Sequence, residues 1–232
     1  HLENLIGKYR TPSNEVYIAT ESVFSMDGDY PDMAALLQLA NTYSCRLIVD
    51  EAHALGVSGK NGQGLVTADD NVFARVVTFG KGLGCHGAAA LGSTELKEYL
   101  VNFARSFIYT TGLPPHSLAA ILCAYHHLEG DGQQEITALQ ELISFFNEEV
   151  VRLGLESFFI DSNSAIHCAV VPGNEKVKAV ALQLQEAGFD VKAILSPTVP
   201  HGSERLRICL HSYNTPKEIT AVLTTLRAAL RL

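Results

Sequence analysis

Two short segments of the chain combine residues that can carry acid–base and nucleophilic chemistry. Asp50 and His53 stand three positions apart at the end of an apolar run, Arg46–Asp50. Lys81 lies in the glycine-rich segment Gly80–Gly84. A carboxylate can hold a protonated ring nitrogen, an imidazole can transfer protons, and a lysine amine can attack a carbonyl carbon. Glycine neighbours let a small ligand approach the backbone closely, because they carry no Cβ.

These residue types meet most of the requirements of a pyridoxal-phosphate (PLP) site. PLP needs a lysine that forms a Schiff base and an acid that keeps its pyridine nitrogen protonated. It also needs N–H groups or hydroxyls around its phosphate, and a cation for the carboxylate of the substrate. Each residue alone has a plainer explanation: Asp50 as a strand-end cap, Lys81 as a solvated loop lysine, and His53 as a structural loop histidine.

The first half of the chain predicts strands that present these segments at one edge of a sheet. Apolar, β-branched runs predict four strands, at 16–20, 46–50, 72–79 and 88–91. Pro31 opens a helical pattern, and the glycines of Gly56–Gly64 predict a loop. Strands separated by helices predict an α/β fold with a parallel, doubly wound sheet. Ligands of such sheets bind beyond the carboxyl ends of the strands, where Asp50 and Lys81 stand.

The second half changes rhythm and predicts a small α+β domain. Helical patterns end near 128 and 153 and cover 175–187 and 216–232, and strand patterns cover 166–171, 191–195 and 205–210. Gly130-Asp131-Gly132 interrupts the helical pattern. Thr215 and Glu218 form a capping box around Pro216, which marks the start of the last helix. We therefore predict two domains, over 1–130 and 131–232.

Composition argues against several classes of partner. The formal net charge of −8 disfavours binding to nucleic acids or anionic membranes, because both need clustered Lys and Arg. No apolar run reaches about 18 residues, so no transmembrane helix is predicted, and no signal peptide opens the chain. The five cysteines are widely spaced without a C-x-x-C pair. We therefore expect no disulfide framework, no metal site and a reducing, cytoplasmic location.

The combined pattern resembles the α-oxoamine synthases. The matching motifs occur in order along the chain, as Val49–His53, Gly56-Val57, Gly62-x-Gly64 and Thr78-x-x-Lys81-x-x-Gly84. Members of this family are fold-type I PLP enzymes that join an amino acid to an acyl-CoA with release of carbon dioxide. The resemblance spans essentially the whole chain. It implies the C-terminal part of the large PLP-binding domain over 1–130 and the small C-terminal domain over 131–232.

Three stretches favour one branch of the family, which joins L-alanine to a pimeloyl thioester in biotin synthesis. They are 20–29 (TESVFSMDGD), 78–89 (TFGKGLGCHGAA) and 197–202 (PTVPHG). Relatives that use glycine, or that make sphingoid bases, usually carry Gly-Gly-Tyr where this chain has Gly87-Ala88-Ala89. A glycine C-acetyltransferase is the alternative within the family.

The resemblance implies a role for individual residues of the large domain. Lys81 binds PLP covalently and later moves the α-proton of the amino acid. Asp50 pairs with the pyridine nitrogen, and Thr78 contacts the phosphate. His53 and Ser25 neighbour the ring oxygen or the substrate.

Further matches imply contacts with the substrate and with a second subunit. Arg207 matches the arginine that holds the carboxylate of the amino acid, and Thr198 lies in a matched stretch at the substrate. Thr110 or Thr111 reaches the phosphate of the partner subunit. The family pattern therefore implies a homodimer with the active site at its interface.

Two departures from the family pattern matter. Family members carry a further N-terminal part of the large domain, which includes a glycine-rich phosphate loop and a residue that stacks on the PLP ring. We therefore expect this chain to be an N-terminally truncated or incomplete form of such a protein. Some relatives also carry arginine where this chain has Leu195.

Two other classes of protein compete with this interpretation. Asp50–His53 spells the Walker B box of one helicase group, but the later Ser/Thr-Ala-Thr motif of those proteins is missing and the chain is acidic. A non-catalytic scaffold that keeps the PLP fold is the second alternative, since a fold does not guarantee a function. A serine hydrolase is not supported, because no G-x-S-x-G motif occurs.

Overall fold

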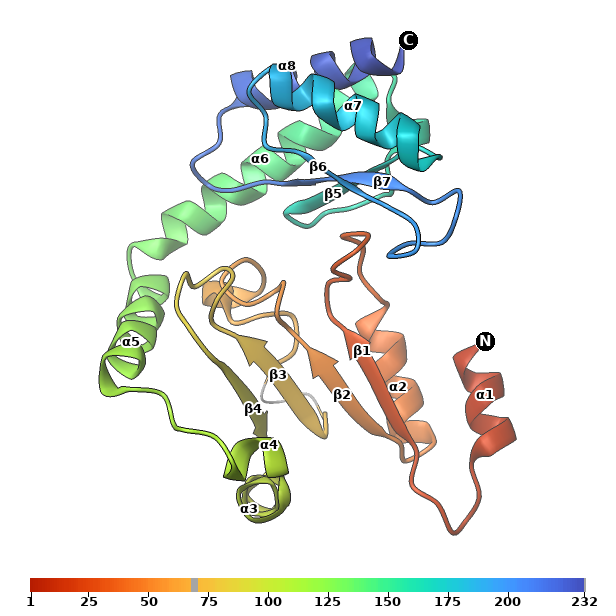
Figure 1. Ribbon diagram of the computed structural model, residues 1–232. Coiled ribbons are helices and arrows are strands. Elements are labelled where there is room, and N and C mark those ends of the chain that lie inside the picture. Colours follow the sequence, from red (N-terminus) through yellow and green to blue (C-terminus); the bar gives the residue numbers. More distant parts are fainter. Residues whose placement is uncertain (68–70, 232) are drawn as a thin grey trace. The chain divides into compact units, whose positions relative to one another are not determined.

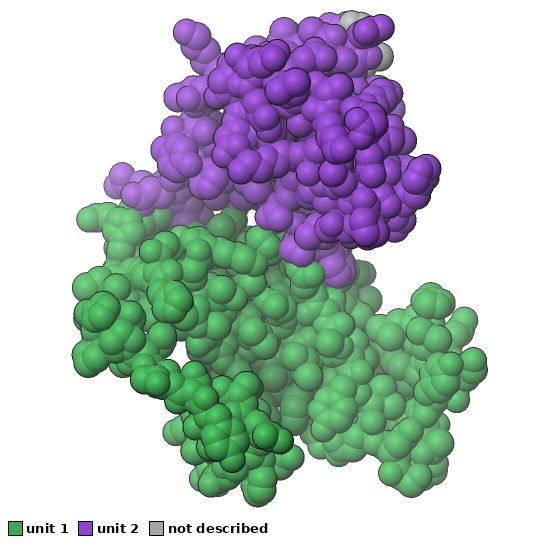
Figure 2. All heavy atoms as spheres, viewed as in Figure 1, with its two compact units in different colours: residues 1–23, 30–133 green, residues 24–29, 134–232 purple. Residues whose placement is uncertain are grey.

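The computed structural model describes residues 1–67 and 71–231, and the chain divides into two compact units (Figure 1). Unit 1 comprises residues 1–23 and 30–133, and unit 2 comprises residues 24–29 and 134–232 (Figure 2). The later boundary between the units lies between 133 and 134, and the predicted domains over 1–130 and 131–232 stay a prediction. Nothing in the sequence pattern distinguished residues 24–29 from their neighbours in unit 1.

Within the described residues, unit 1 is built on a four-stranded sheet with the order β1-β2-β3-β4 (Figure 1). The strands are β1 (Tyr17–Glu21), β2 (Arg46–Asp50), β3 (Ala74–Thr78) and β4 (Ala88–Gly92). Strands β1, β2 and β3 run parallel, so that Glu21 and Val76 both lie opposite Asp50. The predicted α/β class, the four strands and the mostly parallel sheet are confirmed.

Strand β4 runs antiparallel to β3, so the sheet is mostly parallel with one antiparallel strand at its edge. Residues 79–87 connect the two strands, and this loop closes on itself through hydrogen bonds from Phe79 N to Gly87 O and from Cys85 N to Phe79 O. A return to a parallel neighbour needs a crossover connection of about a dozen residues or more. The connection is shorter than that, so the chain reverses direction.

Helices cover unit 1 more extensively than the sequence pattern indicated. They are α1 (Leu2–Tyr9), α2 (Met33–Thr42), α3 (Thr94–Phe103), α4 (Arg105–Ile108) and α5 (Pro115–Glu129), with a 3-10 turn, η1 (Lys60–Gly62), inside the predicted glycine loop. The helix expected from Pro31 begins instead at Met33, because the Asp32 side chain accepts a hydrogen bond from Ala35 N at 2.9 Å and caps it. Helices α1, α3 and α4 were not predicted.

Unit 2 is an α+β unit, as predicted. An antiparallel sheet with the order β5-β7-β6 packs against helices on one face (Figure 1). The described elements are α6 (Gly132–Arg152), η2 (Glu156–Phe158), β5 (Ile166–Val170), α7 (Asn174–Glu186), β6 (Lys192–Ile194), β7 (Arg205–Cys209) and α8 (Pro216–Leu230). The Thr215 capping box is present. Helix α8 ends at Leu230, and the predicted last residue, Leu232, lies outside the described residues. No helix of the described chain is both long and apolar enough to cross a membrane.

Residues 24–29 pack within unit 2, although they directly follow β1 in the chain. The Ser162 hydroxyl donates a hydrogen bond to Gly28 O at 2.8 Å. The Cys168 thiol, whose pKa is raised to about 12 by burial, donates to Met26 O at 3.1 Å. The Arg205 guanidinium also donates to Met26 O and pairs with the carboxylate of Asp27. These contacts bind the segment 24–29 to β5, β7 and the loop before β5.

His167 is a buried polar residue of unit 2, and its imidazole stacks on Phe146 with ring centroids 4.1 Å apart. The residue is 1% exposed, and its Nε2 atom has no hydrogen-bond partner among the described residues. Burial lowers the pKa of His167 to about 4, because the charged imidazolium would lose its hydration. Unit 2 therefore folds with a neutral His167.

We expect the free energy of unfolding to fall by about 3 kcal/mol as the pH drops from about 6.5 to below 4, with most of this loss complete by pH 4. In this window the unfolded chain binds a proton at His167 that the folded chain does not bind, so acid favours unfolding. Urea titrations at several pH values measure the loss. Glu149, whose pKa is lowered from 4.5 to about 2 chiefly by a hydrogen bond from Arg152, stabilises the fold above pH 4.5 and loses that effect as the pH falls toward 2, so it contributes only at the acid end of the His167 window.

The matched variants are His167→Phe and, as a control, His116→Gln at an exposed position on α5. His167→Phe should flatten the pH dependence between pH 6.5 and 4, because it removes the titrating group. His116→Gln should leave the dependence unchanged. A wild-type slope in His167→Phe would contradict the assignment of this acid sensitivity to His167.

Candidate active site

Lys81 and His53 meet beyond the carboxyl ends of two neighbouring parallel strands. Lys81 Nζ lies 2.9 Å from His53 Nε2, within hydrogen-bonding distance. His53 follows β2 by three residues, and Lys81 follows β3 by three residues. Lys81 is exposed and His53 is half-buried. The pair therefore combines an accessible amine with an imidazole that can exchange a proton with it.

Two glycines, Gly56 and Gly82, allow the backbone segments that carry His53 and Lys81 to pack closely against each other. A Cβ added at Gly82 would lie 2.4 Å from Leu55 O and 3.4 Å from Gly56 Cα. A Cβ added at Gly56 would lie 3.0 Å from the carbonyl carbon of Gly82. The loop that carries Lys81 thus packs backbone to backbone on the turn that follows His53, which leaves no space for a Cβ at Gly82 and little at Gly56.

Asp50 is the last residue of β2 and is half-buried. Its Oδ1 accepts a hydrogen bond from Ala52 N at 2.8 Å, and its backbone carbonyl accepts one from Ser22 N at 2.9 Å. Among the described residues, Oδ2 of Asp50 has no hydrogen-bond partner. The carboxylate is therefore fixed through one oxygen, while the other can accept a hydrogen bond from a ligand.

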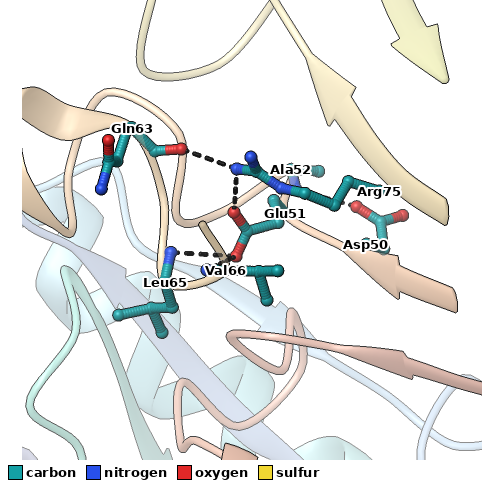
Figure 3. Close-up of polar contacts among 7 residues, drawn as sticks. All are labelled: Asp50, Glu51, Ala52, Gln63, Leu65, Val66 and Arg75. Atoms are coloured by element: carbon teal, nitrogen blue, oxygen red, sulfur yellow. Dashed lines mark hydrogen bonds and ion pairs between the residues drawn. The ribbon is translucent and has the colours of Figure 1, made fainter. Parts of the chain in front are cut away.

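Sequence reasoning assigned no role to Glu51, the residue between Asp50 and Ala52. Its carboxylate is fully buried and accepts hydrogen bonds from Leu65 N and Val66 N, and it pairs with Arg75 at 2.7 Å (Figure 3). The available signal was a second acidic residue, Glu51, directly after Asp50 at the end of a central strand. That signal is equally compatible with a ligand-binding carboxylate and with a buried ion pair.

The threonines predicted at the phosphate lie in unit 1 at different positions. Thr78 is half-buried and ends β3 three residues before Lys81. Thr110 and Thr111 are exposed and follow α4. The structure thus brings Thr78 near the segment that carries Lys81, whereas the predicted contact of Thr110 or Thr111 with a partner subunit stays a prediction.

The remaining predicted residues belong to unit 2. Ser25 is half-buried in the segment 24–29, and Thr198 is exposed in the loop between β6 and β7. Arg207 lies in the middle of β7, opposite Cys168 on one side and Lys192 on the other. Its buried Nε atom has no hydrogen-bond partner among the described residues. That donor distinguishes Arg207 as a residue suited to an anionic ligand.

The residues of unit 1 fit PLP chemically. Lys81 offers an amine, Asp50 offers a carboxylate oxygen for a ring N–H, and Thr78 offers a hydroxyl for a phosphate. A Cβ added at Gly84 would meet no atom within 4 Å, so space is open beside the loop that carries Lys81. The predicted site residues within the described chain do not make a complete cradle for the phosphate.

Comparisons with known proteins agree with this arrangement. A family model described as aminotransferase class I and II matches residues 1–226. The 8-amino-7-oxononanoate synthase of Emericella nidulans is 41% identical over 229 residues, which cover 91% of this chain and 54% of that protein. A putative 8-amino-7-oxononanoate synthase of Geobacillus kaustophilus is 39% identical over 223 residues, covering 94% of this chain and 56% of that protein. The chain thus spans about half the length of these curated relatives.

Solved structures show the same similarity. The 8-amino-7-oxononanoate synthase of Francisella tularensis is 31% identical with a TM-score of 0.83, and the match covers 100% of this chain and 67% of that one. A serine palmitoyltransferase from S. paucimobilis, with bound PLP-myriocin aldimine, has a TM-score of 0.88 at 24% identity. That match covers 99% of this chain and 58% of the other, and it shows the shared fold. The fold is accordingly that of the fold-type I PLP enzymes.

We expect Gly82→Ala to lower the free energy of unfolding by about 1–3 kcal/mol, because the added methyl group overpacks the contact with Leu55 O. Gly112→Ala is the matched control, since its Cβ would meet no atom within 4 Å. The control should change stability by less than about 0.5 kcal/mol. Urea unfolding of both variants measures the difference, and equal stabilities would refute the close contact between the two loops.

Proposed function

Since this chain belongs to the aminotransferase class I and II family, we propose that it carries the Lys81 part of a PLP-dependent 8-amino-7-oxononanoate synthase. The proposed substrates are L-alanine and pimeloyl-CoA or a pimeloyl-carrier thioester. The single observation that carries this proposal is the 2.9 Å contact of Lys81 Nζ with His53 Nε2, beyond the ends of two neighbouring parallel strands, of which one ends at Asp50. The names of the relatives and the three matched stretches support the choice of substrates.

The overall reaction forms a carbon–carbon bond between alanine Cα and the carbonyl carbon of the thioester. The carbon–sulfur bond of the thioester breaks, and coenzyme A leaves as a thiolate that takes a proton from water. The alanine carboxyl group leaves as carbon dioxide, and the proton first removed from Cα is replaced on that carbon. PLP, when bound, supplies the electron sink that stabilises negative charge at Cα.

Each step requires groups that this chain offers. Lys81 Nζ would hold the cofactor, and as a free amine it would take the proton from alanine Cα. His53 Nε2 can take that proton on from Lys81 or polarise the thioester carbonyl. Asp50 Oδ2 accepts the ring N–H and so keeps the ring nitrogen charged.

The other assigned residues bind rather than react. We assign the carboxylate of alanine to Arg207, whose buried Nε needs an acceptor. Ser25 and Thr198 complete the surroundings of the substrate, and Thr78 contacts the phosphate. The proposal includes a homodimer, in which Thr110 or Thr111 reaches the phosphate bound by the partner subunit, and a cytoplasmic location.

We expect Lys81→Ala to abolish both covalent PLP attachment and turnover. The wild-type full-length gene product, treated with PLP and borohydride, should yield a pyridoxyl adduct on the peptide that contains Lys81. Peptide mapping by mass spectrometry and a coupled assay for released coenzyme A measure the two effects. Lys97→Ala, at an exposed position of α3, is the control and should keep both. Turnover that persists in Lys81→Ala would rule out the proposed mechanism.

We expect Arg207→Ala to raise the KM for L-alanine by about tenfold to 100-fold, because a charge-assisted hydrogen bond to the carboxylate is lost. The KM for the acyl thioester should change little. Lys192→Ala, which removes the exposed cation opposite Arg207 on β6, is the control and should leave both KM values unchanged. An unaltered alanine KM in Arg207→Ala would refute this assignment.

A further inference from the structure

The Glu51 carboxylate lies in unit 1 with none of its side chain exposed, which is rare for an acidic residue unless it is paired. Oε1 accepts hydrogen bonds from Leu65 N at 3.0 Å and from Val66 N at 3.2 Å. Oε2 accepts one from Arg75 Nη2 at 2.7 Å. Figure 3 shows the carboxylate enclosed by these three groups. Both oxygens of Glu51 are therefore satisfied inside the protein.

Arg75 joins this carboxylate to the glycine loop. Its Nη2 also donates to Gln63 O at 2.8 Å, and its side chain is 15% exposed (Figure 3). A Cβ at Gly64 would lie 1.9 Å from Glu51 Oε2, so only glycine fits between the ion pair and the loop. Residues 63–66 are thus fixed to β2 through Glu51 and to β3 through Arg75.

A short series of contacts leads from Glu51 to the Lys81–His53 pair. Glu51 O accepts hydrogen bonds from Ala54 N and Leu55 N, both at 3.0 Å, which closes the turn that contains His53. Gly56 N then donates to Gly62 O at 2.7 Å, within the loop that Glu51 and Arg75 hold. Gly56 in turn packs on Gly82, the residue after Lys81.

We propose that Glu51 and Arg75 are positioning residues, which act through the loop 56–66 to keep His53 and Lys81 within proton-transfer distance. The proposal deepens the function proposed above and rests on it for its link to catalysis. Neither residue touches the reacting atoms. Their effect is geometric, because a site built on loops keeps its distances only when buried contacts fix those loops.

The pair also limits the charge beside Asp50. Glu51 follows Asp50 directly in the chain, so an unpaired Glu51 would add a second, buried negative charge at this end of β2. Arg75 balances that charge. Removing one member of a buried ion pair leaves the other uncompensated, so the two residues should be sensitive to single replacement.

The first test does not depend on PLP. In the full-length apoprotein, Glu51→Gln should accelerate amide hydrogen exchange at Leu65 and Val66 by about tenfold or more, because one acceptor oxygen becomes an NH2 donor among three N–H donors, and the ion pair that fixes the side chain is lost. Exchange at 54–56 should also accelerate. Glu15→Gln is the matched control, since Glu15 forms an exposed ion pair with Arg46 at the other end of β2. It should leave exchange at these amides unchanged.

The second test uses the protein loaded with PLP. At saturating PLP and per Lys81 trapped by borohydride, kcat in Glu51→Gln should fall by about tenfold or more. The KM for L-alanine should stay within about twofold of wild type. The pH midpoint of the visible absorbance of the bound cofactor should shift in Glu51→Gln and not in Glu15→Gln. A role in stability alone would reduce the fraction of loaded protein but leave these normalised values unchanged.

Arg75→Lys covers the case in which Glu51→Gln does not fold. Lysine keeps a positive charge beside Glu51, but its shorter side chain lacks the Nη2 atom that donates to both Glu51 Oε2 and Gln63 O, so its effects should be smaller and of the same kind. Wild-type exchange at Leu65 and Val66, or a wild-type kcat and absorbance midpoint in a folded variant, would overturn the positioning role. If wild-type protein forms no adduct at Lys81, the proposed function fails, while the exchange experiment still decides whether the pair holds the loop.

Discussion

Parallel pairing between β2 and β3 determines where the chemical groups of unit 1 can be. The register places Asp50 opposite Val76, so both strands end at the same edge of the sheet. The residues that leave this edge, His53 after one strand and Lys81 after the other, then meet at 2.9 Å. Antiparallel pairing of the same two strands would have sent these groups to opposite edges.

A backbone contact between two loops also fixes the segment that carries Lys81. The turn after β2 and the loop after β3 touch at Gly56 and Gly82, where a Cβ on Gly82 would clash with Leu55 O and one on Gly56 would be crowded by Gly82. The short loop 79–87 then returns as the antiparallel strand β4. The same nine-residue connection thus carries the exposed Lys81 and leads into the edge strand β4. The position of the Lys81 amine therefore depends on the pairing of β3 with β4.

Local pattern was sufficient to predict part of this arrangement and failed where contacts are distant in sequence. The positions of Asp50, His53 and Lys81 at or just beyond strand ends were predictable, because each stands next to an apolar strand or a glycine cluster that marks a strand exit. The partners of Glu51 were not, because Arg75 is 24 positions away and could equally have been a surface arginine. The reversal at β4 was within reach of a loop-length argument, whereas the packing of 24–29 in unit 2 depends on residues more than 130 positions later.

The packing of residues 24–29 in unit 2 has a consequence for the order in which the two units can fold during synthesis. Residues 24–29 leave the ribosome long before Ser162, Cys168 and Arg205 exist, yet those are the residues that bind them. At about 5–20 residues per second, synthesis separates the two sets by roughly 7–35 s. During that time β1 can pair with β2, while residues 24–29 have only the hydrogen bonds within their own turn. The stretch 134–232 therefore cannot form all of the native contacts of unit 2 by itself. A fragment that begins at 134 would lack the hydrogen bonds that Ser162, Cys168 and Arg205 make with residues 24–29.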